Sequence, residues 1–175
     1  MQPRIILFLL LSIAAMGTAL AEDNSPAQPF DTIEPRPTSS GDRIEVIEFF
    51  WYGCPHCFDL EPYLTQWLAA KPEDVDFLRV PAVLGNSWIH YSRVYLAAEN
   101  LGVVDKLHAP LFNAIHEQRI PLNDKDKLGK FLKEHDIDQD KFFEAYASPE
   151  VERKLKNAYV LGQDYGLTEI GRAHV

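Results

Sequence analysis

The 175-residue chain has only two cysteines, and it has no excess of basic residues. Two cysteines cannot build the disulfide framework of a small secreted domain. They are also too few for a structural zinc site, because scattered histidines would have to complete a set of about four ligands. The net charge of −9 at pH 7 argues against a nucleic-acid binder, which needs a basic surface to meet phosphates. We therefore expect neither a metal nor a nucleic acid among its ligands.

Long apolar runs are also rare, and the clearest one lies at the N-terminus. Residues 5–15 are apolar, follow Arg4 and precede Ala19-Leu20-Ala21, which is a small-x-small cleavage site. We predict a cleaved signal peptide over residues 1–21. An uncleaved membrane anchor is the alternative, and the shortness of the run argues against it. An exported chain enters a compartment in which disulfides form.

The two cysteines stand close together, in the stretch Glu-Phe-Phe-Trp-Tyr-Gly-Cys-Pro-His-Cys over residues 48–57. The aromatic and β-branched run before Gly53 predicts a strand, and Pro55 predicts the first turn of a helix. Cys54 should therefore lie at a helix N-terminus, where unpaired N–H groups and the helix dipole favour a thiolate. Cys57 should lie one helical turn further on, buried beneath Cys54 as the resolving thiol.

This arrangement favours thiol–disulfide exchange. A stabilised thiolate is a good leaving group, and its stability in the reduced form makes the disulfide a strong oxidant. His56 can support the Cys54 thiolate with a positive charge or a hydrogen bond. A purely structural bridge is the alternative, but Cys-x-x-Cys closes too small a loop to stabilise the chain much. Haem attachment would need a histidine directly after the second cysteine, where Phe58 stands.

The rest of the chain predicts one more strand and then only helices. Residues 75–80 read as a strand, so that residues 44–80 form a strand–helix–strand unit with parallel strands. Beyond it the apolar period becomes helical, which predicts helices over residues 87–101, 104–118, 124–135, 139–147 and 149–165. The first helix, over residues 54–70, should bury a stripe made of Leu60, Leu64, Trp67 and Leu68.

The stretch over residues 48–57 resembles the active-site segment of the DsbA family, thiol:disulfide interchange proteins of the bacterial periplasm. The order of elements, and Tyr-Gly-Leu-Thr at residues 165–168, are also similar to that family, so the resemblance covers residues 29–168. It implies an α/β, thioredoxin-like βαβ fold with a helical insertion domain. It also implies that Cys54 is the nucleophile, Cys57 the buried partner, and Pro55-His56 the dipeptide that tunes the redox potential.

The same resemblance bears on partners and cofactors. It implies no cofactor beyond the redox-active disulfide, unfolded or reduced exported proteins as substrates, and reoxidation by a DsbB-like membrane quinone reductase. Tyr52 and Trp88 could line an apolar groove for substrate chains, as the family uses. The alternative is that both rings belong to the core, which is the usual place for such aromatic residues.

Glu48 is a further candidate, because it matches a buried acid of the family. It could relay a proton to or from Cys57, the alternative being an ordinary strand carboxylate. Glu61 also matches a family acid, but we expect it on a solvated helix face. We expect four histidines on helix surfaces as well, namely His90, His108, His116 and His135.

These elements set the expected boundaries. They are a signal peptide at residues 1–21, an extended leader at 22–40, a thioredoxin-like βαβ part at 41–82, a helical insertion at 83–148, and a returning helix at 149–168. Beyond the residues that match Thr168, members of the family have a cis-proline that faces the disulfide, then two strands and a terminal helix. Residues 169–175 do not match the family, and residues 170–175 can be back-translated into codons that read like a common sequencing-library adapter. We therefore expect a non-native tail on a C-terminally truncated, impaired chain, with a genuine tail as the alternative.

The sequence thus predicts a periplasmic dithiol oxidase that donates the Cys54–Cys57 disulfide to newly exported proteins. Two alternatives stay open. One is a disulfide reductase or isomerase with the same chemistry. The other is a non-catalytic, exported binding or chaperone-like protein in which the bridge is structural.

Overall fold

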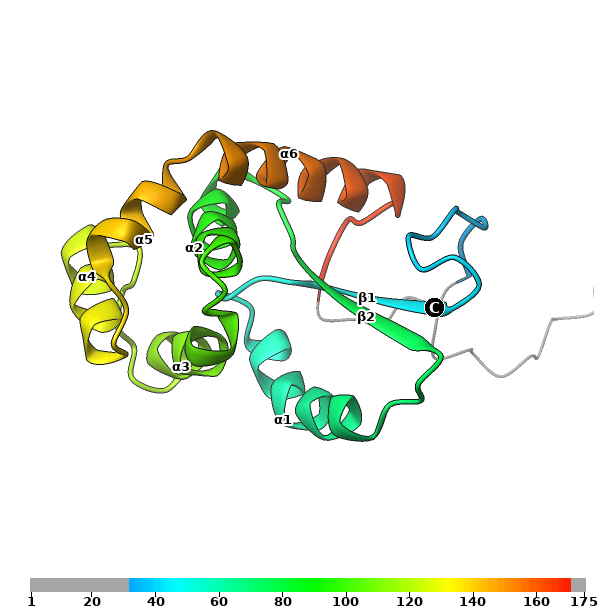
Figure 1. The fold of residues 1–175 in the computed structure, drawn as a ribbon, viewed down its shortest axis with the longest axis horizontal. Coiled ribbons are helices and arrows are strands. Elements are labelled where there is room, and N and C mark those ends of the chain that lie inside the picture. The colour runs from blue at the N-terminus through cyan, green and yellow to red at the C-terminus, as the bar shows by residue number, and fades with distance from the viewer. Residues whose placement is uncertain (1–31, 171–175) are drawn as a thin grey trace, which may run out of the picture.

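The computed structural model describes residues 32–170, which fold into two parallel strands and six α-helices (Figure 1). The signal peptide, most of the leader, and residues 171–175 of the expected tail lie outside the described residues. The elements follow in the order β1 (Ile44–Phe50), α1 (Pro55–Ala70), β2 (Val75–Pro81), the short 3₁₀ helix η1 (Asn86–Trp88), α2 (Ile89–Asn100), α3 (Val104–His116), α4 (Lys125–Glu134), α5 (Gln139–Tyr146) and α6 (Pro149–Asp164).

The strands β1 and β2 pair in parallel, with Ile44 opposite Val75 and Glu48 opposite Arg79. Parallel neighbours need a crossover connection, which α1 supplies. Figure 1 shows α1 on one side of this pair and α6 on the other. The carboxyl end of β1 therefore leads directly into the N-terminus of α1, and this junction carries the two cysteines.

Most of the core lies among the helices that follow β2. The helix α2 is central, because it contacts α3, α5, α6 and β2. Figure 1 shows α3, α4 and α5 gathered at one end of the molecule, with α6 running back towards the strands. Each of these helices buries large apolar side chains, among them Val94, Leu107, Leu111, Leu132, Phe142 and Val151.

Side-chain caps explain where several helices begin. At the start of α4, Asp124 Oδ1 accepts hydrogen bonds from two backbone N–H groups of the first turn. At the start of α6, Ser148 Oγ accepts from the N–H of Val151, and Pro149 occupies the first helical position. Such local signals are visible in the sequence, and the predicted helices therefore agree with the observed bounds to within two residues at each end.

The expectation of a buried stripe on α1 is wrong. Leu60 is 47 % exposed, the other three members of the stripe are only half-buried, and Cys57 is the one buried residue of this helix. Leu78 of β2 is also exposed. A pair of strands covers too little area to bury a whole helix face, so these side chains lack a wide sheet to pack against within residues 32–170.

Candidate redox site

The two cysteines lie where β1 ends and α1 begins. Cys54 is the N-cap residue of α1, and Pro55 occupies the first helical position, as the sequence predicts. The backbone N–H of Cys57 donates a hydrogen bond to Cys54 Sγ over 3.3 Å. The sulfur thus takes the place of the oxygen that caps other helices, and the positive end of the helix stabilises negative charge on it.

Both cysteines are free thiols and are largely covered, with exposed fractions of 6 % for Cys54 and 4 % for Cys57. Burial raises the pKa of the Cys57 thiol above its ordinary value of 9.0, and the hydrogen bond with Cys54 raises it further. Cys57 therefore holds its proton at neutral pH. Pro55 and His56, between the two cysteines, are exposed, so the dipeptide is the accessible part of the motif.

Glu48 lies on β1 beneath the motif and is paired with Arg79 of β2. The Arg79 Nε–H donates to Glu48 Oε2 over 2.5 Å, and only 9 % of the Glu48 side chain is exposed. Burial raises the pKa of Glu48 above its ordinary value of 4.5, although Arg79 acts in the opposite direction. The second oxygen, Oε1, is buried without a hydrogen-bond partner among the described residues. The negative charge of Glu48 also contributes to the raised pKa of Cys57.

Glu61 extends this buried cluster towards the helices, so its expected place on a solvated face is wrong. Its Oε1 accepts from Arg79 Nη2 and from His108 Nε2, each over 3.1 Å. Burial lowers the pKa of His108 below its ordinary 6.5, so the ring is neutral at pH 7. Burial also raises the pKa of Tyr52, so its protonated hydroxyl donates to His108 Nδ1 over 2.9 Å.

The expected surface position of the histidines is therefore wrong for His108, which is buried. His90, His116 and His135 are half-buried, and each has a ring nitrogen within hydrogen-bond distance of a backbone carbonyl. All four histidines thus take part in packing or hydrogen bonding within the fold. Tertiary contacts between helices produce these positions, and the 3.6-residue period of one helix does not reveal them.

Tyr52 and Trp88, the two residues expected to line a substrate groove, lie in different surroundings. Tyr52 is 1 % exposed, and its ring packs edge-on against Phe50 and Phe112 in the core. Trp88 is half-buried and stacks on Trp51, with ring centroids 4.4 Å apart. The ring of Tyr52 is thus covered by protein in this structure, whereas Trp88 keeps some accessible surface.

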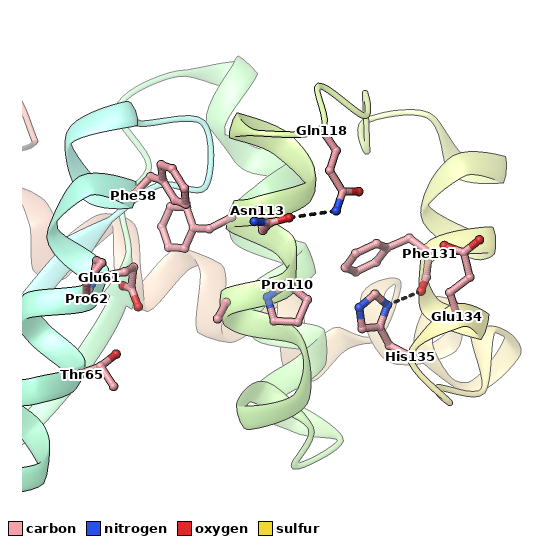
Figure 2. A pocket seen from close by; sticks show the side chains of 12 residues that line it. Phe58, Glu61, Pro62, Thr65, Pro110, Asn113, Gln118, Phe131, Glu134 and His135 are labelled. Atoms are coloured by element: carbon pink, nitrogen blue, oxygen red, sulfur yellow. Dashed lines mark hydrogen bonds between the residues drawn. The ribbon is translucent and has the colours of Figure 1, made fainter.

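A pocket of about 640 Å³ opens beside the motif, between α1, α3 and α4 (Figure 2). Figure 2 shows Phe58 and Glu61 lining it from α1, Pro110 and Asn113 from α3, and Glu134 from α4, with His135 directly after that helix. Phe58 directly follows Cys57 in the chain, so the pocket begins next to the redox motif. Neither Tyr52 nor Trp88 lines it, which separates this hollow from the expected groove residues.

Within residues 32–170, no group of three or more histidine, cysteine, aspartate or glutamate side chains is arranged to hold a metal ion. The acidic and histidine side chains nearest the motif bond to Arg79 and Tyr52 instead. No helix of this same range is long and apolar enough to cross a membrane.

A Cys-x-x-Cys pair at the first helix of a thioredoxin-like βαβ unit, followed by a block of helices, defines a thiol:disulfide oxidoreductase. Residues 64–168 match the family profile described as DSBA-like thioredoxin domain. The thiol:disulfide interchange protein DsbA of Azotobacter vinelandii is 38 % identical over 165 residues, which are 91 % of this chain and 77 % of that protein. The protein of the same name from Burkholderia cepacia is 36 % identical over 164 residues, with the same coverage. The chain belongs to the DSBA-like thioredoxin domain family.

Solved structures agree with this assignment. The crystal structure of Pseudomonas aeruginosa DsbA is 35 % identical and superimposes with a TM-score of 0.73, covering 80 % of this chain and 73 % of that one. The oxidoreductase DsbA from Xylella fastidiosa is 36 % identical, with a TM-score of 0.67 over 72 % of this chain and 69 % of that one. The predicted thioredoxin-like fold class and the predicted oxidoreductase activity are confirmed.

Sequence reasoning missed Arg79, His108 and the contacts of Glu61. A signal for Arg79 was present, because a lone arginine inside an apolar strand needs a buried partner, and pairing the two strands from their first residues places it opposite Glu48. The sequence holds no comparable signal for His108. Its contact with Glu61 depends on how α3 packs against α1, which is a long-range property of the fold.

Proposed function

We propose that this chain is a periplasmic dithiol oxidase that transfers the Cys54–Cys57 disulfide to reduced, newly exported proteins. The observation that carries the proposal is the position of Cys54 Sγ at the N-terminus of α1, 3.3 Å from the backbone nitrogen of Cys57. A thiolate stabilised there favours the reduced form of the pair, and this makes the disulfide an oxidant. Pro55 and His56 are exposed at the same helix end, where they would tune the redox potential.

The reaction has two exchange steps. A thiolate of the substrate attacks Cys54 Sγ of the disulfide, forms a mixed disulfide, and releases Cys57 as a thiolate. A second thiolate of the substrate then attacks the substrate sulfur that is bonded to Cys54. This attack forms the substrate disulfide and releases Cys54 as a thiolate. The substrate dithiol loses two electrons and becomes a disulfide, while the cysteine pair gains two electrons and becomes the reduced pair. Cys57 takes up a proton, because its buried thiol has a raised pKa.

Glu48 is the group that we propose for this proton transfer. Burial raises its pKa above the ordinary value, and a carboxyl group with a raised pKa takes up a proton more readily than an exposed one does. Its free Oε1 is the atom available for this role, because Oε2 is bound to Arg79. Arg79 would keep Glu48 oriented and would limit how far its pKa rises.

The predicted signal peptide supports export, and the family's periplasmic members support the same compartment for this chain. The reduced pair must be reoxidised for further turnovers. A membrane quinone reductase of the DsbB type is the partner that we propose, because it would accept the two electrons and regenerate the Cys54–Cys57 disulfide.

The proposal is tested with the oxidised chain and a reduced, unfolded substrate protein whose regain of activity requires disulfides. Cys54→Ser should lose all catalysed oxidation, because the atom that is attacked is gone. Cys57→Ser should instead accumulate a mixed disulfide on Cys54 that survives in non-reducing gels. If the substrate regains activity as fast with Cys54→Ser as with the native chain, the protein acts as a binding or chaperone-like module, and its bridge is structural.

The proton-relay role is tested by Glu48→Gln in the same assay. We expect the exchange rate at pH 7 to fall about a hundredfold, which is the lower end of the range for losing a general acid or base. Glu61→Gln is the matched control, since it removes the other carboxylate bound to Arg79 and leaves Glu48 in place. A Glu61→Gln rate that falls as far as the Glu48→Gln rate would assign the effect to Arg79 and not to proton transfer.

A further inference from the structure

His116, the last residue of α3, contacts both sides of the cysteine motif. Its Nε2 lies 2.7 Å from the backbone carbonyl of Tyr52. A carbonyl oxygen only accepts hydrogen bonds, so Nε2 carries the proton and donates. The ring also stacks on Phe58, with centroids 4.9 Å apart and planes 9° from parallel. Tyr52 stands two residues before Cys54, and Phe58 directly follows Cys57.

The same face of α3 holds Tyr52 at three points. Residues four apart on a helix share a face, and His108, Phe112 and His116 are spaced in this way. His108 Nδ1 lies 2.9 Å from the Tyr52 hydroxyl, and the Phe112 ring packs against the Tyr52 ring with centroids 5.0 Å apart. His116 then holds the backbone carbonyl of Tyr52. The side chain and the main chain of Tyr52 are thus both fixed by one helix outside the βαβ unit.

We propose that His116 is a positioning residue of the redox centre, which fixes the turn from Tyr52 to Cys54 against the first turn of α1. This inference rests on the proposed role of Cys54 and Cys57 as the redox pair. The turn is short: the N–H of Cys54 donates to the carbonyl of Trp51 over 2.9 Å, and Cys54 then caps the helix. The His116 ring binds the Tyr52 carbonyl, which lies between Trp51 and Cys54, and it also packs on Phe58 in the first turn of α1.

The consequence concerns the balance between the two redox states. The bond from the Cys57 N–H to Cys54 Sγ, at 3.3 Å, joins the residue with which the turn ends to the first turn of α1. This bond stabilises negative charge on sulfur, and therefore the reduced form. A chain without the His116 donor should hold this geometry less tightly, so that its reduced form loses stability relative to its disulfide and it becomes a weaker oxidant.

The test is the redox equilibrium of the full chain with glutathione at neutral pH. In this equilibrium the protein disulfide and two glutathione thiols give the protein dithiol and one glutathione disulfide. His116→Phe keeps a ring over Phe58 but removes the donor. We expect it to shift the equilibrium towards the protein disulfide by about threefold to tenfold, the range of one hydrogen bond. His116→Gln keeps an N–H donor, and it should stay within about twofold of the native chain.

His135→Phe is the matched control. His135 is also half-buried, bonds through a ring nitrogen to a backbone carbonyl over 2.8 Å, and packs on the ring of Phe131. It makes these contacts on α4 and touches neither side of the motif. We expect this variant to keep the native equilibrium constant, although it loses contacts of the same kind.

A second donor-free variant, His116→Leu, replaces His116→Phe if the latter does not fold. A merely structural role would lower the stability of the oxidised and reduced forms equally and leave the equilibrium constant unchanged. That result in a folded donor-free variant overturns this inference alone. A native chain that does not exchange with glutathione at all overturns the proposed function, and this inference with it.

Discussion

The helices α2 to α6 and the β1–α1–β2 unit differ in what they bury. In the helical part, leucine and phenylalanine side chains such as Leu111 and Phe142 are fully covered. In the βαβ unit, Leu60 and Tyr63 of α1 are 47 % and 71 % exposed, while the charged side chains of Glu48 and Arg79 are largely covered. The helical part thus buries mainly large apolar side chains, whereas the βαβ unit buries fewer of them, such as Phe50, and also covers the ion pair of Glu48 and Arg79.

Ion pairs follow the same division. The pair Lys130–Glu134 on α4 is exposed and spans one helical turn, so it stabilises the chain little. The pair Glu48–Arg79 is covered by protein, where charged groups are costly unless they are bonded. The comparison teaches that most apolar burial lies in the helical part, whereas the covered ion pair of Glu48 and Arg79 lies within the βαβ unit beside the cysteines.

The largest expected effect is in the helical core. Phe142→Ala removes a side chain with no exposed surface, so we expect the free energy of unfolding to fall by about 3–5 kcal/mol. Tyr63→Ala, on the exposed face of α1, should change it by less than about 0.5 kcal/mol. Urea denaturation followed by circular dichroism measures both. Equal losses for the two variants would show that the βαβ unit contributes as much apolar burial as the helices.

Arg79→Leu should have the next largest effect, and it should act on both stability and redox behaviour. It leaves Glu48 buried without its cation, which costs about 2–3 kcal/mol after the carboxyl takes up a proton. Lys130→Leu, at the exposed pair, should cost at most about 0.5 kcal/mol. The double variant Glu48→Gln with Arg79→Leu should recover part of the loss in urea denaturation. No recovery would mean that Arg79 stabilises the fold by packing and not by charge.

The smallest effect is a pH dependence from His108. Because its folded pKa lies below 6.5, the unfolded chain binds more protons than the folded chain as pH falls below that value. His108 therefore contributes a loss of stability as the solution becomes more acidic. Between pH 7.5 and 5.5, His108→Phe should show a shallower fall in unfolding free energy than the native chain, by at most about 1.4 kcal/mol per pH unit. Phe112→Leu is the control, and parallel curves for native chain and His108→Phe would contradict the prediction.

The helix and strand bounds were predictable because their signals are local. Ser148 followed by Pro149, and Asp124 ahead of an amphipathic run, mark helix starts that neighbours in sequence decide. The burial of α1 was not predictable from its own pattern. An apolar stripe indicates which face of a helix can be buried, but the surrounding elements determine how much of that face is covered.

The redox site divides in a similar way. The position of Cys54 as a helix cap follows from Gly53, Cys54 and Pro55 alone, and the structure has it there. The surroundings of Glu61 and His108 depend on three elements meeting, α1, β2 and α3, which are separated by tens of residues. Because Glu61 and His108 are polar, the sequence predicted that both would be exposed to solvent. They are covered because Glu61 binds the buried cation Arg79 and His108 binds Glu61.

The sharing of Arg79 between two carboxylates also sets the electrical state of the interior. The cluster of Glu48, Glu61 and Arg79 holds two carboxyl groups and one cation, so the formal charges of these three side chains sum to minus one. When Glu48 binds a proton, the sum becomes zero, and a neutral group is the cheaper one to keep away from water. In the role that we propose for Glu48, the cluster would therefore take up a single proton, and its protonated state is the electrically balanced one.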